Sequence, residues 1–231
     1  MHPIHHAESS ARKFGGVAAD YASAHQFLDC TKETLCDFRH RALRHHSEGI
    51  AELERALGTS LVNSDGSAVP MRYIGEQHVR EDMGFVPSVA DWLRTLDGEP
   101  WMRCGYVNGV AELTASVHAE CSARKFGGEA ADYLAVHEFM DRGAESLGDF
   151  RHRALRHHSQ GIFELERVLG LAITNADGTP VPVRYLGEQH VRAEIGFIPT
   201  VADWLGRLRR ETWMSRGYVV KDNAFARRKG A

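Results

Sequence analysis

The chain repeats one ten-residue stretch without a change: residues 37–46 read DFRHRALRHH, and residues 149–158 read the same. Outward from this stretch the correspondence continues without a gap at an offset of 112 residues (from 37 to 149), and about two-thirds of the aligned pairs are identical. Such self-similarity indicates a tandem duplication of one unit. We therefore predict a first repeat at residues 1–108, a second repeat at 109–220, and a polar tail at 221–231 that has no counterpart.

Two copies this similar are expected to adopt the same fold. Copies of one fold commonly pack about a twofold axis, as the two subunits of a homodimer do. The join near residues 108–109 is short and is not rich in Gly and Ser, which favours a compact pair over two units on a flexible linker. The sequence therefore predicts an internal pseudo-dimer whose repeats are related by a pseudo-twofold axis.

The apolar pattern within each repeat is mainly that of helices. Pro3 is typical of a helix start, and a second helix is expected from about Asp20. Over residues 32–57 apolar residues recur at spacings of three and four, which predicts one long helix, the longest element of the unit. On that helix His46 would lie in the buried stripe, whereas His40 would face solvent.

The second half of each repeat carries the only strand signal. The turn sequence NSDG at residues 63–66 predicts a β-hairpin with strands at 61–62 and 69–74. A short helix is expected at 76–83, and Ser88 with Asp91 resembles a capping box for a last helix. The predicted fold class is α+β, mostly α-helical, with one hairpin in each of two copies.

Composition excludes several classes of protein. Of the 231 residues 43% are hydrophobic and 26% are charged, which is typical of a chain that folds around a core. No apolar run approaches the ~18 residues of a membrane span, and no secretory signal precedes the first repeat, so we expect a cytoplasmic protein without a membrane partner. The formal net charge of −3 argues against nucleic acid as a partner. A small anionic or phosphorylated ligand remains compatible.

Histidine is the residue type that points to chemistry, with 14 in the chain. None of the four cysteines has a cysteine at the equivalent position of the other copy, so free thiols are expected rather than a duplicated disulfide or cysteine metal site. Six histidine pairs do recur: His6/His118, His25/His137, His40/His152, His45/His157, His46/His158 and His78/His190.

Buried imidazoles need a hydrogen bond, a carboxylate or a metal ion as a partner. We predict that three of them converge on one divalent transition metal, with Zn²⁺ the first choice. The candidate ligands are His25, His45 and His78, with His46 as a ligand or its support, and in the second repeat His137, His157, His190 and His158. Two alternatives stay open: the histidines are structural and bind carboxylates and backbone groups, or they act as acids and bases without a metal.

In a catalytic site, a metal-bound water would need a general base to take its proton, and an anionic substrate would need a positively charged side chain to bind it. Glu76 and its copy Glu188 stand two residues before a candidate ligand and are the predicted general bases. The predicted anion contacts are Arg41, Arg44, Arg153 and Arg156. The alternative for these arginines is a solvated helix face with i,i+4 ion pairs.

The repeated stretch also carries a resemblance to a known family. Together with GEQHV at residues 75–79, DWL at 91–93 and WM at 101–102, it resembles a small uncharacterised family from bacteria and their phages. The resemblance implies no activity. It implies one unit per protein, so the present chain would correspond to a dimer made covalent.

Two functions from different classes are compatible with these observations. The first is a cytosolic, histidine-rich metal-binding protein that acts as a metal-dependent hydrolase of a phosphorylated or nucleotide-like substrate. The alternative is a non-catalytic interaction or accessory protein of phage or mobile-element origin whose histidines are structural. The metal content of the purified protein distinguishes the two.

Overall fold

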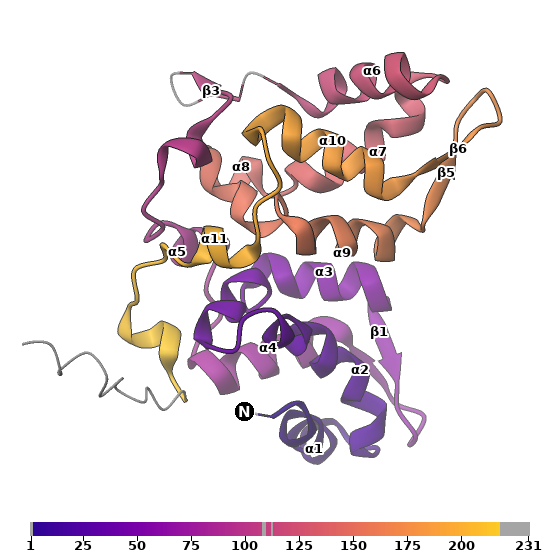
Figure 1. The fold of residues 1–231 in the computed structure, drawn as a ribbon. Coiled ribbons are helices and arrows are strands. Elements are labelled where there is room, and N and C mark those ends of the chain that lie inside the picture. Colours follow the sequence, from indigo (N-terminus) through magenta and orange to yellow (C-terminus); the bar gives the residue numbers. More distant parts are fainter. Residues whose placement is uncertain (1, 108–109, 112, 218–231) are drawn as a thin grey trace, which may run out of the picture.

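The structure is a computed structural model that describes residues 2–107, 110–111 and 113–217 (Figure 1). The first repeat consists of α1 (Pro3–Phe14), α2 (Ala18–Asp29), the 3₁₀ helices η1 (Cys30–Glu33) and η2 (Phe38–Leu43), α3 (Ser47–Leu57), β1 (Ser60–Val62), β2 (Ala68–Pro70), α4 (Met71–Met83), α5 (Val89–Leu93) and η3 (Pro100–Arg103). At the join, β3 (Tyr106–Val107) pairs with β4 (Val110–Ala111).

The second repeat has the same order of elements, except that an α-helix stands where the first repeat has the 3₁₀ helix η1. It consists of α6 (Ala115–Phe126), α7 (Ala130–Asp141), α8 (Ala144–Leu147), η4 (Phe150–Leu155), α9 (Ser159–Leu169), β5 (Ala172–Thr174), β6 (Pro180–Pro182), α10 (Val183–Ile195), α11 (Val201–Leu205) and η5 (Thr212–Ser215). The predicted polar tail at 221–231 lies outside the described residues.

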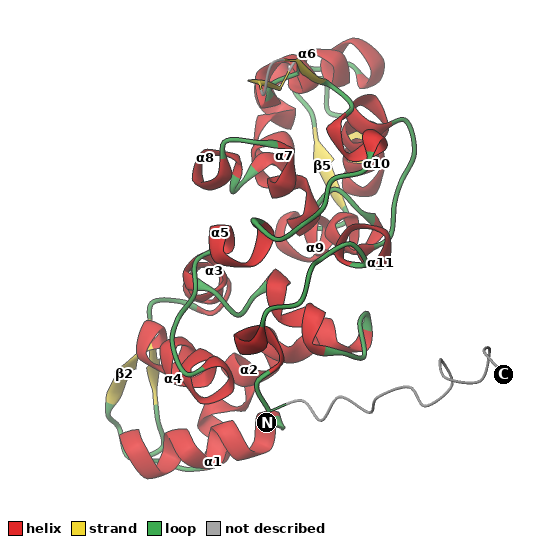
Figure 2. Ribbon diagram, turned by 90° about the vertical axis from the view of Figure 1, so that its left-hand side faces the viewer, coloured by secondary structure: helices red, strands yellow, loops and turns green. Residues whose placement is uncertain are grey.

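The predicted fold class is confirmed, because each copy is mostly helical and carries one antiparallel hairpin (Figure 2). The hairpins have equivalent registers, with Leu61 opposite Val69 and Ile173 opposite Val181. Among the described helices, none is both long and apolar enough to cross a membrane.

The C-terminal segment of each repeat crosses to the other repeat. The 3₁₀ helix η3 of the first repeat packs against η4 and α10 of the second, and η5 of the second packs against η2 and α4 of the first (Figure 1). Between the two crossings, Leu96 and its copy Leu208 form a β-bridge with each other. A pair of equivalent residues in mutual contact lies on a twofold axis, so the bridge marks the pseudo-twofold axis that relates the repeats.

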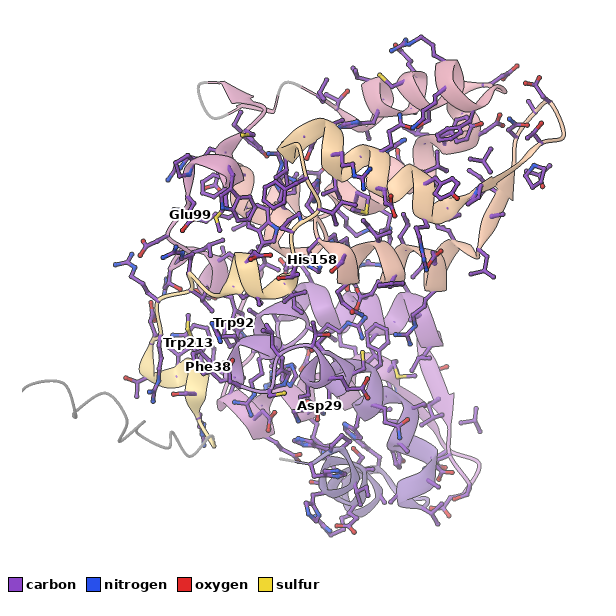
Figure 3. All side chains as sticks on the ribbon, in the orientation of Figure 1. Asp29, Phe38, Trp92, Glu99, His158 and Trp213 are labelled. Carbon is purple, nitrogen blue, oxygen red and sulfur yellow. The ribbon has the colours of Figure 1, made fainter. Side chains whose placement is uncertain are left out.

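Reciprocal contacts confirm this symmetry. Trp92 packs edge-on against Trp213 (Figure 3) with a centroid separation of 4.8 Å. The equivalent pair Trp101 and Trp204 has the same separation. The side chains of Trp92 and Trp204 are completely buried, whereas those of Phe85 and Phe197 are 42% and 44% exposed. The repeats are therefore intertwined through one shared apolar interface, as in an isologous dimer.

The predicted long helix over residues 32–57 is wrong, because the chain breaks twice within it. Asp37 has an extended backbone and accepts a hydrogen bond from the Arg39 N–H, which starts η2. His46 is extended as well, and its Nδ1 accepts from the Gly49 N–H, which starts α3. At Gly49 a Cβ would overlap the carbonyl of Arg44, so the fold-back between η2 and α3 requires glycine. The longest described helices are instead α4 and α10, with 13 residues each.

The boundary between hairpin and helix also differs from the prediction. The second strand ends at Pro70, and α4 begins at Met71 rather than at residue 76. Proline fixes its own φ near the helical value and cannot donate to a strand partner, so it ends the strand and begins the helix. The earlier start places His78 in the third turn of α4, one turn before Asp82.

The crossing predicts how one repeat behaves alone. We expect a fragment of residues 1–107 to form a homodimer, in which η3 of one copy packs on η2 and α4 of the other, the counterparts of η4 and α10. Analytical ultracentrifugation measures the mass. In the same fragment Trp101→Ala should weaken the dimer, since it removes the ring that packs on the partner tryptophan. A folded fragment that stays monomeric at high concentration contradicts this expectation.

Candidate metal centre

Two helices of each repeat carry a histidine followed four residues later by a carboxylate. In the first repeat these pairs are His25 and Asp29 on α2, and His78 and Asp82 on α4. Residues at i and i+4 lie on the same face of a helix. Because α2 packs against α4, both pairs point into the space between the two helices.

Two further segments complete the buried cluster. The chain from η2 to α3 contributes His40 and His45, and α1 contributes His6. All three side chains are buried. The prediction that His40 and its copy His152 face solvent is therefore wrong, because η2 is a 3₁₀ helix packed on η1 rather than one turn of a surface helix.

Four ligand atoms of each repeat lie within 4.8 Å of one another. They belong to Asp29, His45, His78 and Asp82 in the first repeat, and to Asp141, His157, His190 and Glu194 in the second. We call these the Asp29 cluster and the Asp141 cluster. The two imidazole Nε2 atoms of each cluster are 3.1 Å apart.

The imidazole nitrogens around Asp29 Oδ1 lie at distances from it that are typical of two ligands bound to the same metal ion. This oxygen has no hydrogen-bond partner among the described residues, although it is buried. Three imidazole Nε2 atoms surround it, at 3.5 Å for His45 and at 3.7 Å for both His40 and His78. These separations are long for hydrogen bonds. Ligands bound to Zn²⁺ at about 2.1 Å lie about 3.0–3.4 Å apart, which is close to the separations seen here.

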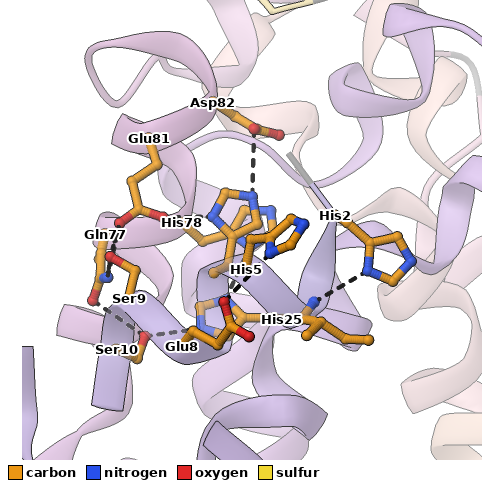
Figure 4. A network of polar contacts seen from close by, with 12 residues as sticks. His2, His5, Glu8, Ser9, Ser10, His25, Gln77, His78, Glu81 and Asp82 are labelled. Atoms are coloured by element: carbon orange, nitrogen blue, oxygen red, sulfur yellow. Dashed lines mark hydrogen bonds and ion pairs between the residues drawn. The ribbon is translucent and has the colours of Figure 1, made fainter. Parts of the chain in front are cut away.

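The protonation of His78 can be traced along a hydrogen-bonded chain (Figure 4). Ser10 donates to Gln77 Oε1, so its Oγ accepts from the His25 Nε2–H at 2.9 Å. Burial lowers the pKa of His25 to about 4, so at pH 7 its Nδ1 is unprotonated and accepts from the His78 Nδ1–H at 3.0 Å. Burial also holds the pKa of His78 well below its ordinary value. The remaining nitrogen, His78 Nε2, is therefore an unprotonated acceptor that faces the Asp29 cluster, 3.1 Å from His45 Nε2.

The carboxylates of both clusters are ionised. Burial by itself would raise the pKa of Asp29, but the three imidazoles around it outweigh burial and hold this pKa below its ordinary value. The pKa of Glu194 is lowered in the same way, because His157 and His118 outweigh the effect of burial. Two imidazoles with two carboxylates form a donor set that suits Zn²⁺ and other first-row divalent ions.

The two clusters differ in the cations beside them. Lys32 Nζ lies 2.6 Å from Asp29 Oδ2, whereas Ala144 stands at the equivalent position of the second repeat. Both clusters keep one buried arginine, Arg41 on Asp82 and Arg153 on Glu194, each at 2.8 Å. The Asp141 cluster therefore has one positive charge fewer beside it.

At the second cluster the carboxylates favour the protonated form of an imidazole. His157 Nε2 lies 2.8 Å from Glu194 Oε2. Burial disfavours the charged form of His157, but Glu194 and Asp141 outweigh burial and raise its pKa. Because a metal ligand must be unprotonated, metal binding at the Asp141 cluster would release this proton.

Some predicted site residues lie elsewhere. His46 and His158 cap α3 and α9 and line a cavity between the repeats. Glu76 is paired with Arg80 on the outer side of α4, and Glu188 is paired with Arg192. The structure does not bring any of these four to a cluster.

The four predicted arginines are buried, so the alternative of a solvated helix face is wrong. Arg41 and Arg153 contact the cluster carboxylates. Arg44 is paired with Glu164 at 2.6 Å, and Arg156 is paired with Glu52, so both join one repeat to the other. Arg41 and Arg153 therefore stabilise the clusters, whereas Arg44 and Arg156 stabilise the interface between the repeats.

The sequence analysis missed the carboxylates. It did not single out Asp29 or Asp82, nor their counterparts Asp141 and Glu194. The signal was present, because histidine is followed by an acidic residue four positions later at 25–29, 78–82, 137–141 and 190–194. It was overlooked at α4 because Glu76, two residues before His78, was taken as the nearby carboxylate.

Comparisons with known proteins agree with the duplication. One family matches the chain twice, over residues 1–102 and over residues 113–214. No curated protein and no solved structure was found to match. The two matches cover most of both repeats, including every residue of the two clusters. The chain therefore belongs to the family described as "Domain of unknown function (DUF6915)" and carries two copies of that domain in tandem.

Proposed function

We propose that the chain is a divalent-metal-binding protein with one centre per repeat, and that Zn²⁺ is the preferred ion. The observation that carries this proposal is the buried Asp29 Oδ1, which has no hydrogen-bond partner among the described residues and faces the unprotonated Nε2 of His78 at 3.7 Å and His45 Nε2 at 3.5 Å. The Asp141 cluster repeats the arrangement, with His190 Nε2 at 3.2 Å from Asp141 Oδ1. A buried carboxylate oxygen without a hydrogen bond is costly unless a cation balances it.

Elemental analysis of protein purified without a histidine tag tests the proposal. About two equivalents of one transition metal per chain are expected. The double variant Asp29→Asn/Asp141→Asn keeps the size of both side chains and should lose the metal. The matched control Glu76→Gln/Glu188→Gln should retain it, because those carboxylates lie outside the clusters. Wild type without metal, even after incubation with Zn²⁺, would instead favour the interaction protein with structural histidines.

The unequal charge beside the two clusters gives a second test. We expect Lys32→Ala to tighten metal binding at the first cluster by about tenfold or more, because the ammonium then no longer repels the ion. Ala144→Lys should weaken the second cluster by a similar factor. Titration against a fluorescent chelator measures both affinities. The control Lys13→Ala removes an exposed charge from the same repeat and should change neither. Equal affinities in wild type and in both variants contradict the expectation.

A hydrolytic role is the second candidate, and one observation favours it. A cavity of about 830 Å³ reaches Asp29 from the outside and is also lined by Lys32, which would attract a phosphorylated or nucleotide-like substrate. Four protein ligands leave room for a bound water if the ion expands its coordination, and the metal would lower the pKa of that water. Glu76 lies outside the cluster and is not part of this candidate reaction.

Hydrolysis of p-nitrophenyl phosphate by the zinc-loaded and the manganese-loaded chain tests this second role. Turnover should disappear in Asp29→Asn/Asp141→Asn and persist in Glu76→Gln/Glu188→Gln. Metal binding without turnover of any phosphate ester would leave metal binding as the function and reject hydrolysis.

A further inference from the structure

Three buried histidines of the second repeat form a group of their own beside the Asp141 cluster. They are His118 on α6, His137 on α7 and His190 on α10, and α7 packs against both other helices (Figure 1). One nitrogen of each ring lies within 4.8 Å of one nitrogen of each of the other two. No more than 1% of any of these residues is exposed. We call this group the His118 trio.

Two nitrogens of the trio have the separation of metal ligands. His137 Nδ1 and His190 Nδ1 are 3.0 Å apart. Two ligands that bind Zn²⁺ at about 2.1 Å are about 3.0 Å apart when they form a right angle at the ion. The other nitrogen of His137 lies 2.9 Å from Ser122 Oγ, and a hydrogen bond of this kind orients metal-binding imidazoles. The two Nδ1 atoms can therefore share a proton or bind one ion.

His190 belongs to the trio and also to the Asp141 cluster, because its two nitrogens face different sides. Its Nδ1 faces His137, whereas its Nε2 lies 3.2 Å from Asp141 Oδ1. With an ion on each side the ring has no N–H left and binds both ions as an imidazolate. Filling both sides therefore releases one proton from the pair of His137 and His190, and this proton leaves for solvent.

Glu194 supplies negative charge to both sides as well. Its Oε2 lies 2.8 Å from His157 Nε2 in the Asp141 cluster, and its Oε1 lies 3.4 Å from His118 Nε2 in the trio. An ionised carboxylate attracts a cation on either side of it, most strongly in a buried place. The trio therefore has three imidazoles for ligands and a carboxylate beside one of them.

The first repeat has a carboxylate partner where the second repeat has none. His6 is the counterpart of His118, and its Nδ1 lies 2.6 Å from Glu81 Oε2. Ala193 stands at the position of Glu81, so the second repeat cannot form this pair. Loss of the carboxylate leaves the three rings of the second repeat to bind one another or an ion.

The hydrogen bonds beside the trio are incomplete in the second repeat. In the first repeat Gln77 Oε1 accepts from the Ser10 hydroxyl, which also contacts His25 Nε2. The counterpart Gln189 has a buried Oε1 without a hydrogen-bond partner among the described residues. A buried acceptor without a donor is destabilising. Water bound to an ion in the trio is a donor of the kind that this oxygen lacks.

We propose that the His118 trio binds a second divalent transition-metal ion in the second repeat, and that His190 is shared between this ion and the ion of the Asp141 cluster. Imidazole ligands suit Zn²⁺ and Cu²⁺. The sharing rests on the proposed function, because it requires an ion in the Asp141 cluster, whereas the trio itself does not. None of the three ligands is a carboxylate, so this ion is held more weakly than the cluster ions and is lost during purification.

Titration of the metal-free full chain with Zn²⁺ against a fluorescent chelator tests the proposal. We expect three ions per chain, the third bound about tenfold or more weakly than the other two. The variant His118→Leu replaces one ligand by an apolar side chain of similar size, and the count should fall to two. The matched control His6→Leu makes the same change at the equivalent place of the first repeat and should keep three.

A further variant separates the trio from the clusters. Asp29→Asn/Asp141→Asn should still bind one added ion, and combination with His118→Leu should remove it. A wild-type count of two overturns the inference and leaves the proposed function intact. One ion that survives Asp29→Asn/Asp141→Asn and is lost in His118→Leu supports the trio even if the clusters bind none. A third ion that persists in His118→Leu, or that His6→Leu also removes, overturns the inference.

Anomalous X-ray diffraction from wild-type crystals soaked in Zn²⁺ locates the ions without any variant. We expect one peak in each cluster and a third peak between α6, α7 and α10. A trio that stays empty while the Asp141 cluster is filled overturns the inference.

Discussion

Removal of both metal ions by EDTA is expected to lower the melting temperature of the wild-type chain by roughly 16–32 °C. A ligand that binds only the folded state stabilises it by RT ln(1 + [L]/Kd) per site, which is about 4 kcal/mol at a thousandfold excess over Kd and about 8 kcal/mol for two sites. For a chain of this length, 1 kcal/mol corresponds to about 2–4 °C. Differential scanning calorimetry with and without EDTA measures the shift.

The variant His78→Ala/His190→Ala should melt at the same temperature with and without EDTA. Each change removes one imidazole ligand from its cluster and also the hydrogen bond to His25 or His137, so the variant should melt below the wild type as well. The control Glu76→Gln/Glu188→Gln should keep the full EDTA shift. A wild type that is indifferent to EDTA after long incubation would argue against a metal in either cluster.

Acidification is expected to have the second large effect. Burial lowers the pKa of His137 and His158 to about 3 and the pKa of His25, His152 and His190 to about 4, while the unfolded chain keeps an ordinary value near 6.5. Below pH 6.5 the unfolded chain therefore binds protons that the folded chain does not, and stability falls with pH until the folded groups titrate as well. Each such histidine removes about 2 kcal/mol at pH 5.

Urea unfolding at pH 7, 6 and 5 in the presence of EDTA measures this loss without a contribution from metal. The free energy of unfolding should fall by several kcal/mol between pH 7 and pH 5. His157, whose pKa is raised, acts in the opposite direction, and its contribution is lost as the pH rises above 6.5. The variant His158→Asn should reduce the slope by about 1.4 kcal/mol per pH unit, since one titrating group is gone. The lowered carboxylate pKa values add their own loss only below about pH 4. A stability that does not change between pH 7 and pH 5 contradicts the buried neutral state of these rings.

Much of the fold could be predicted because the signals are local. The proline at residue 3, the turn at 63–66 and the capping box at Ser88 each act through the few residues around them, and the structure has α1, the hairpin and α5 at these places. The apolar spacing over residues 32–57 led to a wrong prediction, because such spacing indicates which residues are buried but not whether the helix is continuous. The break depends on the caps at Asp37 and His46 and on the close approach at Gly49.

The candidate site could be predicted only in part for the same reason. His25, His45 and His78 come together because apolar faces of three elements pack on one core, which the pattern indicates. His45 and His46 were expected on one helix, yet they serve different places. His46 has an extended backbone at the helix start, and consecutive side chains of an extended chain point in opposite directions. One ring therefore faces the Asp29 cluster, and the other accepts a hydrogen bond at the start of α3.

The amino-acid sequence by itself determined the duplication, the mostly helical units with one hairpin each, and the histidines on which a site would be built, because identity and periodicity are properties of the chain alone. Only the tertiary structure decided that Asp29 and Asp82 complete the cluster, that the C-terminal segments exchange between repeats, and that the change from Lys32 to Ala144 alters the charge beside a buried carboxylate. These depend on contacts between residues distant in sequence, whose energies are set by burial and by which charge lies within a few ångströms.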